Sequence, residues 1–376
     1  MKFIVSSEVL YRNLSAVSGV MSSNNSMPIL DNVLMTISEN KLTLTASDLE
    51  TTMTAVIDLD NVEGEGSVAV PARILVETLK LIPATPIVFV IDAENNLLKF
   101  TAANGEYDAP CFPGDEFPKI NPMADPKSFD IEAAVLQRAI SKTLFATGND
   151  ELRPNMMGVL CELSEDYVTF VATDAHKLVR YRNNKVKSAE PTTLILPKKP
   201  ITHLKSILSG VPGDVHVEYS QDTNHICFSF SNFVLFSSLR EGKYPAYESV
   251  IPQENPYSLV VSRDEFLKSI RRVGIYSNQS TFQVRISLTE EKTQLTAEDM
   301  DYSNKAAEEI SGVYSGDPMD IGFNSRFLRE MLENMDSEQI RIEMSKPNRA
   351  ALILPEQEFD ENESLLMLIM PVMLNY

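Results

Sequence analysis

The side chains best suited to chemistry are clustered acids and a few histidines, because carboxylates hold divalent cations or move protons and imidazoles act as general bases. The acidic clusters are Asp48-Leu49-Glu50 and Glu298-Asp299-Met300-Asp301. Both occupy equivalent positions of an internal repeat, which favours turn or rim residues over a catalytic pair or a metal site. The histidines are not at metal-ligand spacing, and none has an assignable catalytic partner: His176, His203, His216 and His225.

No nucleotide-binding or hydrolase motif accompanies these groups. The chain has no Gly-x4-Gly-Lys-Ser/Thr, His-Glu-x-x-His or Gly-x-Ser-x-Gly. Residues 64–69 fit Gly-x-Gly-x-x-Ala, but they precede an expected strand, and glutamates stand where a pyrophosphate would bind. Cys111, Cys161 and Cys227 form no close pair and no zinc-ligand spacing. The sequence therefore predicts no catalytic residue, no metal and no cofactor, and it favours the cytoplasm.

The elements that position these residues recur with a period of about 126 residues. Three markers keep the same order in each repeat: an opening strand and helix, an Ala-x-Asp triplet after an alternating strand, and a short strand running into an amphipathic helix. The first marker aligns on Val5, Ile131 and Val261, the second on Asp48, Asp174 and Asp299, and the third on Pro71, Pro197 and Asn324.

Two repeats also end alike, and these ends predict the linkers. Glu116-Phe117-Pro118 and Lys243-Tyr244-Pro245 lie 127 residues apart, and proline-bearing stretches follow both. We therefore expect three domains, at 1–126, 127–254 and 255–376. Each has two helical patterns and many short alternating runs, which predicts an α+β fold with antiparallel sheet on one side and two helices on the other.

The charge distribution separates the helices from the rest of the chain. Lys and Arg number 33 against 53 Asp and Glu, a net charge of −20. The net charges of the six expected helices nevertheless sum to +6, which leaves −26 for the rest of the chain. These helices span residues 6–17, 71–82, 131–145, 197–208, 262–275 and 325–336. Helix propensity does not explain this, because Glu favours helices as much as Lys and Arg do. The pattern favours a basic face that contacts phosphates without reading bases.

Domain size indicates how such a face could surround a duplex. A domain of this length has a diameter of about 35 Å, so three in a circle leave almost no hole and six leave a hole of about 35 Å. A DNA duplex is about 20 Å across. One chain therefore cannot encircle DNA, whereas a closed head-to-tail pair can.

Five short segments along the chain form a recognisable set: the opening Met1-Lys2-Phe3, Met27-Pro28-Ile29-Leu30, Val70-Pro71-Ala72-Arg73, Ala172 to His176, and Met370-Pro371. With these segments the chain resembles, over essentially its full length, the bacterial DNA polymerase III beta subunit, the sliding clamp. The resemblance implies a homodimeric ring of six domains, with helices inside and sheets outside, that tethers the replicative polymerase alpha subunit to double-stranded DNA. It also implies a processivity factor that is not an enzyme, a separate clamp loader that opens the ring, and no membrane partner.

The C-terminus predicts a second kind of site. Pro371 lies within an apolar run and cannot donate to a sheet ladder, so the last strand should end near Ile369. Exposed methionine and leucine side chains beyond it suit a groove for short hydrophobic peptides. The resemblance implies such a groove between the second and third domains, for the polymerase and for other polymerases and repair proteins. Its matching residues are Arg153, Met156, Thr173, Ala175, His176, Lys177, Leu178, Pro245, Ser249, Val250, Leu368, Met370, Pro371, Val372, Met373 and Leu374.

Several groove positions depart from the family pattern. Ala175 replaces a glycine, Lys177 and Ser249 replace arginines, and Asn155 replaces a tyrosine. These changes leave the expected place of the groove intact but alter the surface that a peptide meets.

The resemblance also implies DNA-facing and dimer-forming residues. Tyr107 and Ala109 are expected to meet Ile275 and Tyr276 of a second copy. Asn24 stands where some relatives have a DNA-contacting arginine. The remaining DNA-facing candidates are helix cations: Arg73, Lys80, Arg138, Lys142, Lys198, Lys199, Lys205, Lys268, Arg271 and Arg272.

Two other functions compete with a clamp. An acidic enzyme could act on a carbohydrate or phosphoester through the repeated aspartates, in which case Asp174→Asn would abolish turnover. A repeat scaffold could bind proteins only, in which case the chain would not associate with circular DNA at any salt concentration.

Overall fold

The computed structural model describes residues 1–22, 27–102, 104–119, 123–188 and 190–374. They form two compact units, one of residues 1–134 and 199–239 and the other of residues 135–198 and 240–376. Each unit contains two antiparallel sheets with helices packed on them.

The larger sheet of the first unit has nine strands. Their order is β10 (Phe112–Pro113), β6 (Gly66–Pro71), β2 (Asn32–Ser38), β3 (Lys41–Ser47), β4 (Thr51–Asp58), β18 (Phe233–Ser238), β17 (His225–Phe230), β16 (Asp214–Ser220) and β11 (Lys127–Glu132). The smaller sheet has the order β5 (Val62–Glu63), β1 (Lys2–Ser6), β7 (Pro86–Asp92), β8 (Leu97–Ala102) and β9 (Gly105–Pro110).

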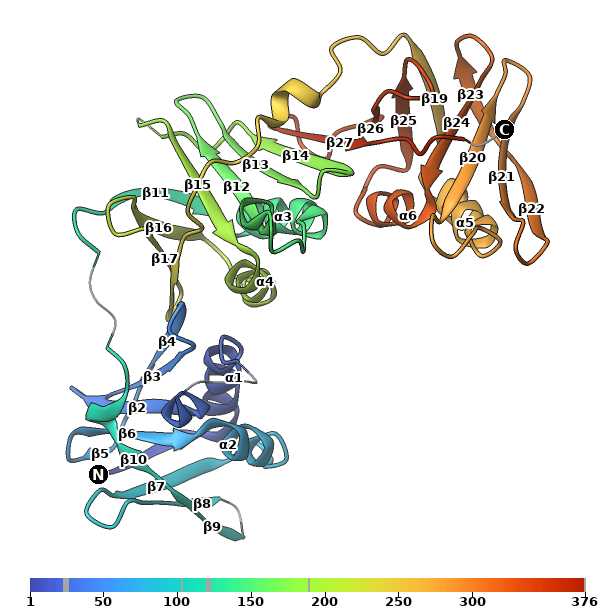
Figure 1. Cartoon of the computed structure of the whole chain (residues 1–376). Helices are drawn as coiled ribbons and strands as arrows, with labels where there is room; N and C mark the ends of the chain where they lie inside the picture. Colours follow the sequence, from blue (N-terminus) through green and yellow to red (C-terminus); the bar gives the residue numbers. More distant parts are fainter. Residues whose placement is uncertain (23–26, 103, 120–122, 189, 375–376) are drawn as a thin grey trace. The chain divides into compact units, whose positions relative to one another are not determined.

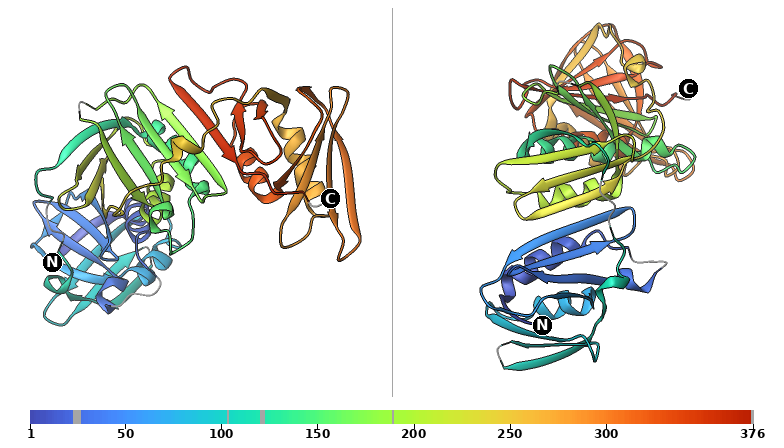
Figure 2. Two further views of the ribbon diagram at one scale, coloured as in Figure 1. Left: turned by 45° about the horizontal axis from the view of Figure 1, so that its top comes forward. Right: turned by 90° about the vertical axis from the view of Figure 1, so that its left-hand side faces the viewer.

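Helices α1 (Ser7–Ser18), α2 (Ala72–Leu79) and α4 (Lys198–Ile207) belong mainly to this unit. Leu10, Leu14 and Val17 of α1 are spaced to share one helix face, and all three are buried. Helices α1 and α2 lie side by side (Figure 1), and both contact strands of the nine-stranded sheet. The right-hand view of Figure 2 shows these two helices, in blue, against strands of the same colour.

A row of aromatic rings crosses the five-stranded sheet. Phe3, Phe89, Phe100 and Tyr107 stand on consecutive strands, with successive ring centroids 4.9, 5.2 and 4.8 Å apart. Stacked aromatic pairs across strands stabilise a sheet beyond the area that they bury. The row ends on β9, the edge strand.

The second unit also has a nine-stranded sheet. Its order is β15 (Thr192–Pro197), β12 (Gly158–Leu163), β13 (Val168–Thr173), β14 (Lys177–Asn183), β27 (Glu363–Ile369), β26 (Ala351–Pro355), β25 (Gln339–Met344), β19 (Tyr257–Ser262) and β23 (Gly312–Ser315). Four strands form the other sheet, β22 (Asn304–Ile310), β21 (Thr293–Asp299), β20 (Gln283–Leu288) and β24 (Met319–Asn324).

Helices α3 (Ala133–Thr143), α5 (Arg263–Gly274) and α6 (Ser325–Glu333) belong mainly to the second unit. The sequence caps two of them: the Ser262 hydroxyl accepts a hydrogen bond from the Glu265 N–H, and the Asn324 side chain accepts from Arg326 and Phe327. Helices α5 and α6 contact each other.

The predicted α+β fold and its repeat are confirmed. The strand-into-helix marker appears as β6–α2, β15–α4 and β24–α6, and the opening marker as β1–α1, β11–α3 and β19–α5. Strand pairing also passes from one repeat to the next, which the sequence did not predict: β4 pairs with β18, and β14 pairs with β27. Among the helices of the described residues, none has the length and apolar content of a membrane span.

Candidate functional site

The C-terminal segment leaves the sheet where the proline predicts. Strand β27 ends at Ile369, and the Met370 N–H then donates to the His176 carbonyl at 2.9 Å. The Val372 N–H donates to the Gly322 carbonyl at 2.8 Å. Two backbone bonds thus hold the segment, while the Met373 side chain remains 70% exposed.

Gly322 on β24 allows this close approach. A Cβ atom there would lie 2.6 Å from the Val372 carbonyl oxygen and 2.8 Å from Leu374 Cδ2. Of the three residues expected on the surface, Val372, Met373 and Leu374, only Met373 is exposed, and the other two are half-buried. The absence of a side chain at Gly322 therefore fixes where the segment lies.

A tight turn between β13 and β14 borders this segment. The Asp174 carboxylate accepts from the backbone N–H groups of His176 and Lys177, both at 2.9 Å. The Thr173 hydroxyl accepts from the Ala175 N–H at 3.1 Å. Ala175 has φ = 75°, in the left-handed region.

The same turn joins β3 and β4 in the first unit. The Asp48 carboxylate accepts from Glu50 and Thr51, and Leu49 has φ = 77°. The aspartates of the first two repeats are therefore turn residues, as the sequence favoured, whereas Asp299 of the third repeat is the last residue of a strand, Thr293–Asp299, and accepts from the Asp301 N–H at 3.1 Å. Within the described residues, no group of three or more His, Cys, Asp or Glu side chains is arranged to hold a metal.

We predict that Ala175→Gly stabilises the second unit. An L-residue in the left-handed region costs about 1–2 kcal/mol, and glycine loses about 0.5–1 kcal/mol of chain entropy, so the net gain should be about 0.5–1 kcal/mol. Urea unfolding monitored by circular dichroism measures it. The matched control is Ala139→Gly, inside α3, which should instead destabilise by about 1 kcal/mol. A destabilising Ala175→Gly would contradict the prediction.

Lys177 is buried beneath the turn. Its ammonium lies 3.1 Å from the Asp174 carboxylate, 2.7 Å from the Glu330 carboxylate and 4.6 Å from the centre of the Phe327 ring. The His176 ring stacks on the same Phe327 at 5.9 Å. Lys177 therefore supports the turn from below and offers little surface to a ligand.

Sequence reasoning did not single out Phe327. It lies on α6 outside the buried stripe that contains Leu328, Met331 and Leu332. An aromatic residue outside the apolar stripe of an amphipathic helix is the signal that would have found it.

Two short 3-10 turns, η4 (Pro154–Met157) and η5 (Tyr247–Val250), bring further predicted residues to this region. The Asn155 amide donates to the Lys243 carbonyl at 2.9 Å and so ties the two segments together. Arg153 pairs with Asp150 at 2.8 Å. Val250 is exposed, and Met156 and Pro245 are half-buried. Ser249 is exposed and donates to the Ala246 carbonyl.

A buried apolar cluster supports the region. The predicted residues Leu178 and Leu368 belong to it and are only 2% exposed. They therefore support the predicted groove from the core and offer almost no surface to a ligand. Tyr244 and Tyr247, beside η5, belong to the same cluster. The structure therefore gathers the predicted groove residues around the turn, the C-terminal segment and the two 3-10 turns.

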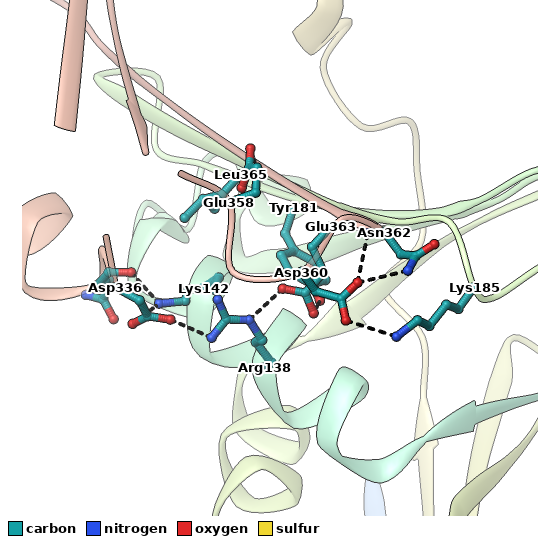
Figure 3. A network of polar contacts seen from close by, with 11 residues as sticks. Arg138, Lys142, Tyr181, Lys185, Asp336, Glu358, Asp360, Asn362, Glu363 and Leu365 are labelled. Carbon is teal, nitrogen blue, oxygen red and sulfur yellow. Dashed lines mark hydrogen bonds and ion pairs between the residues drawn. The ribbon is translucent and has the colours of Figure 1, made fainter. Parts of the chain in front are cut away.

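A network of polar contacts joins further residues of the second unit (Figure 3). Arg138 donates to Glu363 at 2.7 Å and to Asp336 at 2.5 Å, and Lys142 donates to Asp336 at 2.6 Å. The Tyr181 hydroxyl donates to Glu363 at 2.6 Å. These residues line a cavity of about 560 Å³.

This network removes two residues from the DNA-facing set. Burial lowers the pKa of Lys142, whose side chain is 7% exposed. Burial raises the pKa of Asp336, but hydrogen bonds from Lys142 and Arg138 outweigh it and lower that pKa overall. Arg138 and Lys142 are thus bound by carboxylates and do not have the free, exposed heads that phosphate contact requires.

The other predicted helix cations differ in their partners. Arg73 pairs with Glu77, Lys199 with Asp48, Arg271 with Glu333 and Arg272 with Glu308, and Lys198 donates to Asn149. In the part of the chain that the structure describes, Lys80, Lys205 and Lys268 have no carboxylate partner. Asn24 lies outside the described residues.

The predicted dimer residues lie in two separate places. Tyr107 on β9 is 37% exposed, whereas Ala109 on the same strand is buried. Ile275 and Tyr276 follow α5 and are 70% and 44% exposed. Three of the four therefore offer apolar surface.

Comparison with known proteins covers nearly the whole chain. Three family profiles match in order: the N-terminal domain of the DNA polymerase III beta subunit over residues 1–121, its central domain over 130–246, and its C-terminal domain over 248–373.

Individual relatives agree with the profiles. The chain is 29% identical over 375 residues to the beta sliding clamp of Pseudomonas aeruginosa, with 100% of both chains covered. It is 28% identical over 344 residues to that of Escherichia coli, covering 91% of this chain and 92% of the relative. A crystal structure of the Pseudomonas aeruginosa sliding clamp bound to griselimycin has a TM-score of 0.93 at 28% identity, with 100% of both chains covered. The Bacillus subtilis clamp, at 23% identity and a TM-score of 0.92 over 100% of both chains, shares the fold.

Proposed function

The chain belongs to the DNA polymerase III beta subunit family and is a sliding clamp, a processivity factor for DNA polymerase; we propose that it works as a closed head-to-tail ring of two copies with no catalytic site of its own. Its place of action is the cytoplasm, where a clamp loader opens the ring around duplex DNA. The domain boundaries that we propose are 1–126, 127–254 and 255–376.

The exposed C-terminal methionines carry the proposal for partner binding. Met370 and Met373 present flexible apolar side chains on a segment that backbone hydrogen bonds hold in place. Val250 adds exposed apolar surface on η5. A short peptide with hydrophobic anchors suits such a surface. The replicative polymerase alpha subunit, the clamp loader, and other polymerases and repair proteins would each dock one such peptide here.

Among the predicted DNA-facing cations within the described residues, three lysines have no carboxylate partner. We assign phosphate contact to Lys80, Lys205 and Lys268, because carboxylates already hold most of the other helix cations. Phosphate contacts alone give weak, readily exchanged binding. Retention then depends on ring closure, and weak contacts leave the ring free to slide.

We predict that Lys80→Gln, Lys205→Gln and Lys268→Gln together reduce the salt dependence of DNA binding. Each lost phosphate contact lowers the slope of log K against log salt by about 0.9, so three should lower it by about 2.7 per chain. Fluorescence anisotropy on a short duplex at several salt concentrations measures the slope. Arg73→Gln is the control, because Arg73 pairs with Glu77 and its loss should change the slope less. An unchanged slope in the triple variant would remove these lysines from the DNA-facing set.

Retention on circular DNA tests the function itself. After assisted loading, the clamp should remain on a closed circle in high salt and should leave once the circle is cut. Electrostatic adhesion would be lost from both forms alike. If the clamp were lost equally from closed and cut DNA, the proposal that it encircles DNA would be wrong.

A further inference from the structure

We propose that Arg180 binds a side-chain carboxylate of the partner peptide, so that the groove selects peptides with an aspartate or glutamate two residues from a hydrophobic anchor. The inference rests on the peptide groove of the proposed function and deepens it by naming the chemistry of the partner. Arg180 lies on β14 and is not among the groove residues that the sequence predicted.

Arg180 shares a face of the sheet with the residues that support the groove. Side chains alternate along a strand, so Arg180 is on the same face as Leu178, and their Cα atoms are about 7 Å apart. Its neighbours across the sheet are Val171 on β13 and Leu366 on β27. Both belong to the buried apolar cluster that contains Leu178, and they are 0% and 9% exposed. A charged side chain therefore stands within an apolar row beside the groove.

The polar groups on the opposite face of β14 cannot neutralise this charge. Tyr181, the next residue, points to that opposite face, where its hydroxyl donates to Glu363 within the network of Figure 3. Glu363 also binds Arg138 there. Because the sheet separates Glu363 from Arg180, this carboxylate is not available to the Arg180 guanidinium.

The Arg180 guanidinium has no partner on its own face either. Its Nε atom is buried, and among the residues that the structure describes no acceptor or carboxylate pairs with the group. Burial lowers the pKa of Arg180, the like charge of Arg182 lowers it further, and the exposed Glu248 opposes both without reversing the shift. Arg182 differs, because it lies 3.8 Å from the centre of the Tyr167 ring and donates to Thr169 at 3.1 Å.

An unpaired cation beside an apolar surface favours a ligand that has both an apolar group and a negative charge. A buried charge without a counter-ion destabilises a protein, and a carboxylate accepts two hydrogen bonds from one guanidinium. The chain as a whole has a net charge of −20, so an acid elsewhere on a bound peptide meets repulsion. The groove should therefore favour an acid at one position of the peptide and disfavour it at the others.

The strand spacing gives that position. In an extended peptide, side chains on the same face are two residues and about 7 Å apart, which equals the separation of Leu178 and Arg180. A peptide that runs along β14 with an apolar side chain over Leu178 therefore places the side chain two residues away over Arg180. The face of β14 thus specifies both the anchor and the distance to the acid.

A glutamate scan of a bound peptide tests the pair. The probe is a fluorescein-labelled peptide with the clamp-binding segment of the replicative polymerase alpha subunit and an amidated C-terminus. A single glutamate is moved along it, and each version has a glutamine counterpart. Fluorescence anisotropy should show one position, two residues from a hydrophobic anchor, at which glutamate binds about tenfold more tightly than glutamine.

Two variants of the clamp assign the effect to one arginine. Arg180→Met should abolish the difference between the glutamate and glutamine peptides while leaving the glutamine peptide bound as before. Arg182→Met is the matched control on the same strand and face, and it should keep the difference. A difference that persists in Arg180→Met, or that disappears only in Arg182→Met, overturns the proposal.

Unfolding in urea separates a binding role from a structural one. Arg180→Met replaces an unpaired cation with an apolar side chain of similar length, so it should raise the midpoint of unfolding. A lowered midpoint would show that Arg180 supports the fold, and it would overturn the proposal.

The remaining outcomes distinguish this inference from the groove itself. If the peptides bind but no glutamate position gains affinity, or if only a free C-terminal carboxylate does, the assignment to a side-chain acid is wrong and the groove stands. If the peptides do not bind, or bind equally well to a clamp with Met373→Lys and Leu374→Lys, the groove of the proposed function is wrong and the inference falls with it.

Discussion

A clamp with Met373→Lys and Leu374→Lys should lose polymerase stimulation almost completely while still forming dimers. Met373 is 70% exposed and Leu374 packs on Gly322, so both belong to the surface that we assign to partner peptides. Each apolar side chain that a peptide covers contributes about 1.5–3 kcal/mol, and losing two lowers peptide affinity at least about a hundredfold. Fluorescence anisotropy with a labelled polymerase-tail peptide measures the affinity, and primer extension on a long template measures the stimulation.

Val313→Lys is the matched control for this result. Val313 lies on β23 and is 72% exposed, close to the value for Met373, but it is far along the chain from every groove residue. This variant should retain peptide binding and primer extension. Wild-type processivity in the Met373 and Leu374 double variant would show that partners dock elsewhere.

Glu363→Ala should destabilise the second unit by about 3–5 kcal/mol, the range measured when one partner of a buried ion pair is removed. Glu363 accepts hydrogen bonds from Arg138 and from the Tyr181 hydroxyl. Its loss leaves a largely buried guanidinium short of one acceptor and a buried hydroxyl without its partner. Urea unfolding should show an early loss of the second unit while the first unit is unchanged.

Two variants bracket that effect. Glu363→Gln keeps an acceptor for Tyr181 and should lose less stability than the alanine variant. Lys292→Ala removes an exposed pair with Glu309 and should cost less than about 1 kcal/mol. If Glu363→Ala proved as mild as Lys292→Ala, the network would contribute little to the stability of this unit.

Local patterns predicted the parts of the fold that depend on neighbouring residues. The strand-into-helix marker at Pro71 and Pro197 appears as β6–α2 and β15–α4 because alternation and helical periodicity are properties of a short window. The end of β27 at Ile369 followed from the chemistry of Pro371, which has no N–H to donate. The aspartates of the first two repeats were recognised as turn residues because their spacing recurred.

Contacts between distant residues could not be predicted in this way. Arg138 bonds to carboxylates 198 and 225 residues further along the chain, and helix composition alone placed it among the DNA-facing cations. The sheets that pass from one repeat to the next were missed for the same reason, since alternation does not say which strand pairs with which. Ala109 was expected on a dimer surface, but it is buried, although it lies on the same face of β9 as the partly exposed Tyr107.

The sheets that contain strands of two repeats limit how far the chain can be truncated without exposing a strand edge. A truncated chain that ended at the second linker would lack β27. The seven residues of β14 that pair with β27 would then form an unpaired strand edge. Bare, apolar strand edges recruit other chains, so we expect such a fragment to precipitate. A member of this family could therefore lose or gain a repeat only if another strand took the place of the lost pairing partner. The number of repeats is thus linked to the stability of each repeat.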